Sequence, residues 1–247
     1  MIGLLLWKSP EAGKRQKSVV LSECSVLQMR FICVEILRGA KTPEAILRRR
    51  VLVAAKKFRR AGVTEIVPPA RFAYLPQLEK CGVRPVSTLT LRRALAGAVV
   101  RSEVSRLGLS PTGARVAVAG ENLTGELVKT VRELALMHRY VLLDVPRGGA
   151  ELCRQLRREY GVSLLLNPSK EQLDEAEVLV LFSPREDLAG KNSVLLPLYE
   201  GAEACLPPMR LPQALEGQLP EGADRTALLA ALQRAGAIRA EQVLLGT

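Results

Sequence analysis

Residues 115–149 read RVAVAGENLTGELVKTVRELALMHRYVLLDVPRGG, which is two short apolar runs on either side of a segment with helical periodicity. Two further apolar runs follow before Pro184, and each of the four is followed by turn residues. Strands that are apolar on both faces are typical of a parallel sheet covered by helices, with crossovers of a dozen or more residues. We therefore predict an α/β fold, with parallel strands at 116–119, 141–143, 162–166 and 178–182.

The loops that follow these runs are the expected place for a ligand. In an open parallel sheet, ligands bind beyond the carboxyl ends of the strands, where helix N-termini and variable loops converge. We expect Lys170 and Arg185 to add positive charge to this edge. Which residues would be catalytic stays unknown. The predicted binding residues are Gly120, Asn122, Thr124, Gly125, Asp144, Arg147, Gly148 and Ser183.

Three stretches of this region resemble a Rossmann-like NAD(P)-binding domain at the level of the fold. VAVAG (116–120) is similar to a first strand that ends in glycine, and VLLD (141–144) to a second strand that ends in an acid. DEAEVLVLFSP (174–184) is similar to the strand beside the nicotinamide in many dehydrogenases. The resemblance implies a dinucleotide across Gly120 and Gly125, with its ribose held by Asp144. It identifies no specific family, and the cofactor stays unknown, with NAD or NADP as the options.

The loop GENLTG (120–125) departs from the G-x-G-x-x-G pattern that lets a backbone approach a pyrophosphate. Glu121 and Glu126 flank the place where phosphate would lie, and a carboxylate there repels the anion and occupies the helix dipole. A P-loop is excluded, because Glu126 and Leu127 stand where it needs Lys and Ser or Thr. The alternative is that Thr124 only caps a helix, the glycines only ease a turn, and the sheet is a scaffold.

The chain offers little for acid–base or metal chemistry. His138, the only histidine, precedes the second strand, so it lies at the opposite edge of the sheet from Asp144. With one histidine and dispersed cysteines, we predict no metal site of the His-rich or Cys-rich kind. Our first hypothesis for function is therefore a protein that binds a nucleotide or another anionic small molecule at the carboxyl ends of these strands. The second hypothesis is an NAD(P)-dependent oxidoreductase, in which the cofactor would supply most of the chemistry.

The net charge of +11 is unevenly distributed along the chain. Residues 1–110 contain 21 basic and 7 acidic residues, whereas residues 111–247 contain 15 and 18. GLSPTG (108–113) has the composition of a loop or linker at the point where the charge changes. We therefore predict two domains, a basic α/β lobe at 1–110 and a Rossmann-like lobe with a C-terminal helix at 111–247.

Much of the positive charge lies on a predicted helix at 43–61, with Thr42 as its N-cap and Pro43 in its first turn. The third hypothesis is a non-catalytic scaffold or polyanion-binding protein, for which nucleic acid is a possible partner. The alternative is that these cations only form the solvated outer face of a helix that packs against a sheet. The stripe predicted to be buried comprises Leu47, Val51, Ala54, Ala55 and Phe58, and the outward cations are Arg49, Lys56, Arg59 and Arg60.

The remaining segments predict more α/β structure. We expect a hairpin loop at 9–17 between the first two strands, an extended connection at 201–222, and a helix at 224–234 capped by Asp224. The other predicted strands are 2–7, 18–21, 29–36, 63–67 and 83–86, and the other predicted helices of the first half are 71–80 and 90–107.

The five cysteines are odd in number and contain no C-x-x-C pair, which is typical of reduced proteins. The N-terminal apolar run at 2–7 is shorter than a signal-peptide core, and no stretch approaches the roughly 20 residues of a membrane span. We therefore expect a cytoplasmic protein with no membrane partner. The oligomeric state stays open.

Overall fold

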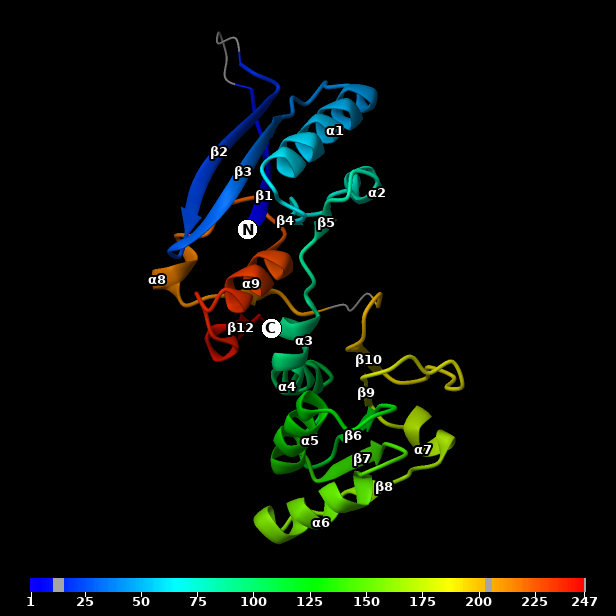
Figure 1. The fold of residues 1–247 in the computed structure, drawn as a ribbon. Coiled ribbons are helices and arrows are strands. Elements are labelled where there is room, and N and C mark those ends of the chain that lie inside the picture. The colour runs from blue at the N-terminus through cyan, green and yellow to red at the C-terminus, as the bar shows by residue number, and fades with distance from the viewer. Residues whose placement is uncertain (11–15, 203–205, 247) are drawn as a thin grey trace. The chain divides into compact units, whose positions relative to one another are not determined.

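The computed structural model describes residues 1–10, 16–202 and 206–246. Contacts within the chain divide it into two compact units, each built on one five-stranded sheet (Figure 1). Unit 1 comprises Met1–Thr88 and Met209–Leu244, and unit 2 comprises Leu89–Pro208 and Leu245–Thr247. The predicted division into domains at 1–110 and 111–247 stays a prediction.

The sheet of unit 2 is parallel throughout, as the apolar runs predict. Its order is β10-β9-β6-β7-β8, so the first strand of the unit lies in the centre and the strands that follow extend to both sides. Counted from β6, this is the 3-2-1-4-5 order of a Rossmann-like sheet. The strands are β6 (Arg115–Ala119), β7 (Tyr140–Asp144), β8 (Leu165–Leu166), β9 (Val178–Leu181) and β10 (Val194–Pro197).

Three of the four predicted strands are confirmed with small shifts at their ends, but the prediction for 162–166 is too long. Only Leu165 and Leu166 pair with β7, opposite Leu142 and Leu143. The chain leaves α6 at Gly161, whose φ of 70° lies in the left-handed region. It then runs apart from the start of β7 and pairs with that strand from Leu165 onward. The apolar composition of the run therefore does not mark where its pairing begins.

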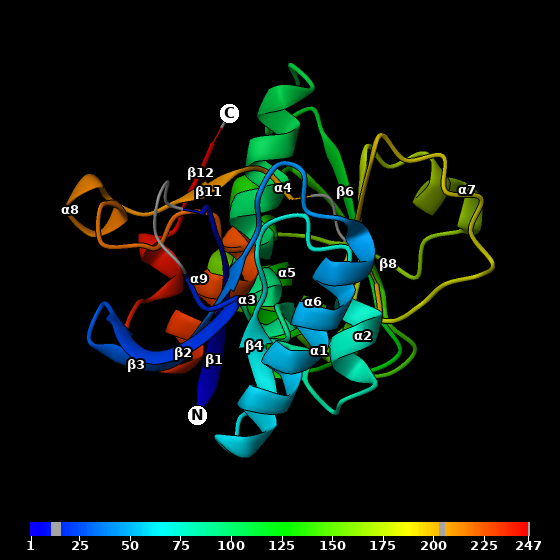
Figure 2. The same cartoon turned by 90° about the horizontal axis from the view of Figure 1, so that it is seen from above.

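The two faces of this sheet are covered unequally. A Cβ at Gly149, which begins α6, would meet the side chains of Leu166 and Leu143. Helix α6 therefore lies on the face of the sheet from which these two side chains project. Leu173, from α7, packs instead with Ala117 and Leu142 on the opposite face. Figures 1 and 2 show α5 and α7 on opposite sides of the sheet. The helices are α5 (Gly125–Met137), α6 (Gly149–Tyr160) and the five-residue α7 (Lys170–Asp174).

The predicted helix at 90–107 is two helices, α3 (Leu89–Ala94) and α4 (Ala96–Arg106), which meet at Leu95. Both contact α5. Arg92 of α3 is buried, and its guanidinium donates to the carbonyl oxygens of Tyr199 (3.3 Å) and Ala202 (2.9 Å). The break in the helix therefore coincides with the point where α3 binds the chain beyond β10.

Unit 1 contains a mixed sheet in the order β2-β3-β1-β4-β5. The hairpin predicted between β1 and β2 is wrong, because β1 is parallel to both β3 and β4 and is the central strand. The antiparallel hairpin is β2–β3, turning at Leu27 and Gln28, both with positive φ. Part of the predicted loop at 9–17 lies outside the described residues. The strands are β1 (Ile2–Lys8), β2 (Val19–Val26), β3 (Met29–Leu37), β4 (Glu65–Val67) and β5 (Arg84–Pro85).

The helix predicted at 43–61 is confirmed as α1 (Glu44–Arg60), and all five residues of its predicted apolar stripe are buried. Phe58 packs so closely on β1 that a Cβ at Gly3 would lie 2.5 Å from its ring. The prediction of Thr42 as the N-cap is wrong. Pro43 occupies that position, and the Thr42 hydroxyl accepts from the backbone N–H of Gly39 (2.9 Å) instead.

A second helix, α9 (Arg225–Arg234), covers the other face of this sheet. Ile66 of β4 packs with α1, whereas its neighbour Glu65 forms an ion pair with Arg234 of α9 (2.8 Å). Asp224 caps α9 as predicted, accepting from the N–H of Ala227. The segment at 201–222 is not wholly extended, since it contains α8; residues 203–205 lie outside the described part. The remaining elements are α2 (Leu75–Glu79), β11 (Met209–Arg210), α8 (Gln213–Glu216), the 3-10 helix Ala240–Gln242 and β12 (Leu244–Leu245).

Among the described residues, none of the helices has the length and apolar character that a membrane crossing requires.

His138 connects the end of α5 to the loop before β6. Its ring is buried, and Nδ1 lies 3.2 Å from the carbonyl oxygen of Pro111. Burial lowers the pKa of His138; the hydrogen bond to Pro111 opposes this shift, and the nearby Arg101 adds to it. The neutral imidazole therefore donates from Nδ1 and stabilises the native loop.

We predict that the imidazole of His138 titrates below the ordinary histidine value near 6.5. A lowered native pKa means that the unfolded chain binds the proton first. The contribution of His138 is therefore present above the unfolded pKa and is lost as pH falls through the native one. Because the chain has one histidine, a single imidazole NMR resonance reports the pKa, and His138→Gln should flatten the pH dependence of unfolding. Titration at or above the ordinary value would contradict this account.

Candidate functional site

The site lies at the carboxyl ends of β6, β7 and β9, which form one rim of the unit 2 sheet. The strands after β6 extend to one side as β7 and to the other as β9, so the chain order reverses at β6. Such a reversal is where ligands bind in open α/β sheets. The rim carries all eight predicted binding residues: Gly120, Asn122, Thr124, Gly125, Asp144, Arg147, Gly148 and Ser183.

Specific contacts hold the three loops of this rim together. The N–H of Gly120 donates to the carbonyl of Asp144 (3.0 Å), and the N–H of Glu121 donates to the buried hydroxyl of Ser183 (3.1 Å). A Cβ at Gly148 would lie 3.0 Å from Leu123, so the loop after β7 touches the loop after β6. The loop after β6 is therefore fixed by the strands on both sides of it.

The start of α5 presents backbone N–H groups to this rim. Thr124 is the N-cap, and its hydroxyl accepts from the N–H of Leu127 (3.2 Å). In the described part of the chain, the N–H groups of Gly125 and Glu126 have no hydrogen-bond acceptor. Unpaired N–H groups at the positive end of a helix are suited to bind an anion.

A crevice of about 110 Å³ lies beside this helix start. Asn122, Thr124 and Ser183 were predicted as site residues, whereas Arg93 and Phe182 were not. Arg93 lies on α3, far earlier in the sequence, and no motif or spacing connects it to the GENLTG loop. The adjacent pair Arg92–Arg93, between Leu91 and Ala94, is the sequence signal that could have indicated it. The crevice is lined by Arg93, Glu121, Asn122, Thr124, Phe182 and Ser183.

Arg93 is fixed in place by three neighbours. Its Nε donates to the carbonyl of Leu198 (2.9 Å), and its Nη1 forms an ion pair with Glu126 (2.6 Å). Its guanidinium lies 5.6 Å from the centre of the Phe182 ring. Arg93 thus neutralises one of the two glutamates that would repel an anion here, and Glu121 remains as the other.

Asp144, predicted to hold a ribose, forms an ion pair with Arg185 from the loop after β9. Arg185 also pairs with Asp187 (2.7 Å), which pairs in turn with Lys170 (3.2 Å). Hydrogen bonds from Arg185 hold the pKa of Asp187 well below its usual range, and those bonds raise the pKa of Arg185. These four side chains balance one another in charge.

Arg147 differs from the other two cations predicted at this rim. Its side chain is exposed, and no carboxylate pairs with it within residues 1–10, 16–202 and 206–246. It precedes Gly148, which touches the loop after β6. Arg147 is therefore the cation of this rim that an incoming ligand meets without displacing a carboxylate.

The two glycines of the GENLTG loop have different roles. A Cβ at Gly120 would lie 2.8 Å from Leu127 Cδ1 and 3.2 Å from Phe182 Cβ, so this glycine lets α5 and β9 approach β6. A Cβ at Gly125 would meet nothing within 4 Å. Gly120 therefore serves packing, whereas Gly125 leaves the start of α5 open.

Comparison with known proteins finds distant structural similarity alone. No family model and no curated protein matches the chain. Among solved structures, ornithine carbamoyltransferase from Pyrococcus furiosus is 17% identical, with a TM-score of 0.26, over 60% of this chain and 50% of its own. L-tryptophan dehydrogenase from Nostoc punctiforme is 10% identical, with a TM-score of 0.30, over 68% and 51%.

D-lactate dehydrogenase with NAD+ from Lactobacillus jensenii is 13% identical, with a TM-score of 0.27, over 62% of this chain and 56% of its own. The matched part of the chain thus spans about half the length of these three proteins. TM-scores this low carry no argument about function. The Rossmann-like description of unit 2 rests on its strand order and parallel pairing.

The different roles of the two glycines predict opposite effects on stability. Gly120→Ala should lower the free energy of unfolding by about 1–3 kcal/mol, because the added methyl group overpacks the β6–α5 contact. Gly125→Ala, the matched control, should leave it unchanged or raise it by up to about 1 kcal/mol. Urea unfolding of both variants measures this. Equal effects would show that α5 is not packed tightly against Gly120.

Proposed function

We propose that unit 2 binds a nucleotide or another small anionic molecule at the rim formed by the carboxyl ends of β6, β7 and β9. The observation that carries this proposal is that the N–H groups of Gly125 and Glu126 have no acceptor among the described residues. They lie beside the crevice and at the reversal of strand order. Helix N-termini in this position accept phosphate or carboxylate groups in α/β proteins.

The charges of the crevice indicate which part of the ligand enters it. Glu126 is paired with Arg93, which reduces its repulsion of an anion. The exposed carboxylate of Glu121 still repels an anion in the crevice. A volume of about 110 Å³ is below the roughly 300–1,000 Å³ of sites that enclose a small molecule. The crevice therefore holds one anionic group, and the rest of the ligand extends along the rim past Arg147.

Hydride transfer is not needed for this proposal. Asp144 already pairs with Arg185, so a ribose in the place that the Rossmann resemblance implies would compete with an ion pair. The hypothesis of an NAD(P)-dependent oxidoreductase stays a prediction, and the same ligand panel tests it.

A thermal-shift panel of NAD, NADP, mononucleotides and sugar phosphates tests the proposal. A ligand at 100 times its dissociation constant stabilises the native state by about 2.7 kcal/mol, which raises the melting temperature by several degrees. Asn122→Asp should abolish the shift by adding a carboxylate to the crevice. Glu121→Gln should strengthen binding a few-fold, because it removes the repulsion that remains.

Ser193→Asp is the matched control, because it adds one carboxylate to unit 2 at an exposed position before β10. It should leave the shift as large as in the wild type. A wild-type protein that no ligand of the panel stabilises would contradict the proposal. So would a shift that Asn122→Asp and Ser193→Asp reduce equally, since that would reflect net charge alone.

A second candidate function, binding of a polyanion such as nucleic acid, has its own observation. Arg49, Lys56, Arg59 and Arg60 of α1 are all exposed, and within the described residues none of them forms an ion pair. Unit 1 contains 21 basic and 10 acidic residues, whereas unit 2 contains 15 of each. The entire net charge therefore belongs to the unit that carries α1.

Retention on heparin tests this second candidate. Changing the four cations of α1 to Gln should cause earlier elution and a shallower dependence of binding on salt, because fewer counterions are released. The control changes four exposed arginines of unit 2, namely Arg132, Arg154, Arg157 and Arg158. Equal losses in both variants would indicate nonspecific attraction and contradict a role for α1.

A further inference from the structure

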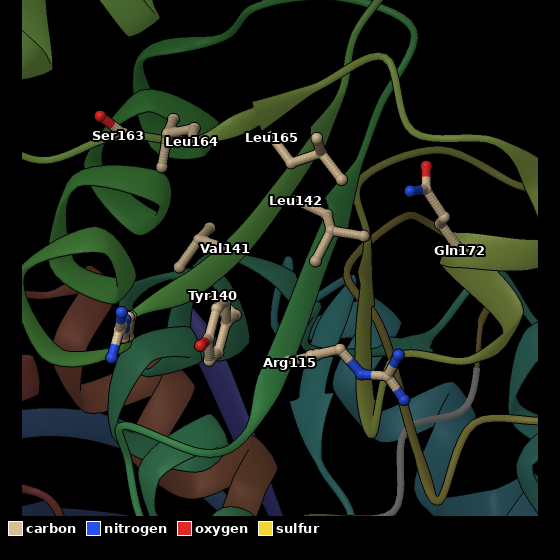
Figure 3. A pocket seen from close by; sticks show the side chains of 9 residues that line it. Arg115, Tyr140, Val141, Leu142, Ser163, Leu164, Leu165 and Gln172 are labelled. Carbon is tan, nitrogen blue, oxygen red and sulfur yellow. The ribbon is translucent and has the colours of Figure 1, made fainter.

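A second pocket lies where β7 and β8 separate. The two strands pair only at Leu142–Leu165 and Leu143–Leu166, so Tyr140 and Val141 have no partner in β8. The space between them and residues 163–165 is a pocket of about 340 Å³, here called the fork pocket (Figure 3). The first residues of β6 and β7 line it, whereas the rim that carries the crevice lies at the carboxyl ends of these strands. The two sites are therefore at opposite ends of the strands. The lining residues are Arg115, Arg139, Tyr140, Val141, Leu142, Ser163, Leu164, Leu165 and Gln172.

The apolar part of this pocket is exposed because the sheet extends beyond the helix that covers it. One register row crosses the whole sheet on the α7 face, and its middle residues are buried with Leu173 of α7. At the ends of the row, Leu165 is 47% exposed and Leu195 is 48% exposed. Figure 3 shows the neighbouring side chains of Leu142 and Leu165 on the same side of the sheet as Gln172 of α7. The row is Leu195, Leu179, Ala117, Leu142 and Leu165.

The two arginines of the fork pocket differ in what they already bind. Arg115 pairs with Glu175 (3.3 Å) and Glu177 (3.5 Å), so its charge is balanced. Arg139 lies 5.4 Å from the centre of the Tyr140 ring, and in the described part of the chain no carboxylate pairs with it. An apolar pocket with one such guanidinium is complementary to an apolar molecule that carries a single negative charge.

We infer that the fork pocket binds a small carboxylic acid with an apolar body. The carboxylate accepts from the guanidinium of Arg139. The body, aromatic or aliphatic, lies between the start of β7 and residues 163–165. The volume of about 340 Å³ lies within the range of small-molecule sites, and the inference is independent of the function proposed for the rim.

Titration calorimetry with 4-phenylbutyrate as the probe tests the charge requirement. The wild-type protein should bind it saturably. The neutral 4-phenylbutyramide should bind at least about tenfold more weakly, because it cannot form a charge-assisted hydrogen bond with Arg139. Arg139→Gln should cause a similar loss. Arg132→Gln, which removes an exposed arginine of α5, should cause none.

A second pair of variants locates the body of the ligand. Leu165→Glu places a carboxylate in the fork pocket and should abolish binding. Leu195→Glu, at the other end of the same row and equally exposed, should leave it intact. Circular dichroism confirms that each variant folds, and Asn122→Asp should have no effect, which separates this site from the crevice.

Absence of saturable binding by the wild type up to millimolar probe would overturn the inference. Binding that persists in Leu165→Glu and Arg139→Gln, or that Arg132→Gln weakens equally, would overturn it as well.

Discussion

The close approach of α5 and β9 to the central strand β6 is the contact on which the arrangement of unit 2 depends. β6 contains small residues, and at its end Gly120 leaves room for Leu127 on α5 and Phe182 after β9. The same geometry brings the loops after β6, β7 and β9 within hydrogen-bond distance of one another. The N–H groups at the start of α5, which have no acceptor among the described residues, therefore lie on a rim held together by these contacts rather than on an isolated loop.

Charge pairing decides which groups of this rim are available to a ligand. The cations Arg93, Arg185 and Lys170 are each paired with a carboxylate, so they position loops more than they attract anions. Exposed pairs of this kind contribute little to stability on their own. Among the described residues, Arg147 at the rim, Arg139 at the fork pocket and the four cations of α1 pair with no carboxylate, and these three sets belong to three different proposed interactions.

The sequence predicts the parallel sheet of unit 2 well because its central strands are continuous apolar runs, and it predicts α1 because one apolar stripe repeats at helical spacing. It predicts the pairing of β1 wrongly, since hairpin signals are local whereas the parallel pairing of Ile2–Lys8 with β3 and β4 is not. It places the start of β8 too early because Val162 and Leu164 are apolar but do not pair with β7. Arg93 was missed because its contacts with Leu198 and Glu126 join residues that are distant in sequence.

The function proposed for unit 2 requires that an anion bind at the start of α5 on the rim. The most direct measurement follows the backbone amide resonances of the ¹⁵N-labelled protein during titration with pyrophosphate. We expect the largest shifts at residues 121–126 and 147–148, including the amides of Gly125 and Glu126, and little change at α1. Shifts confined to α1, or no saturable change at residues 121–126, would contradict it.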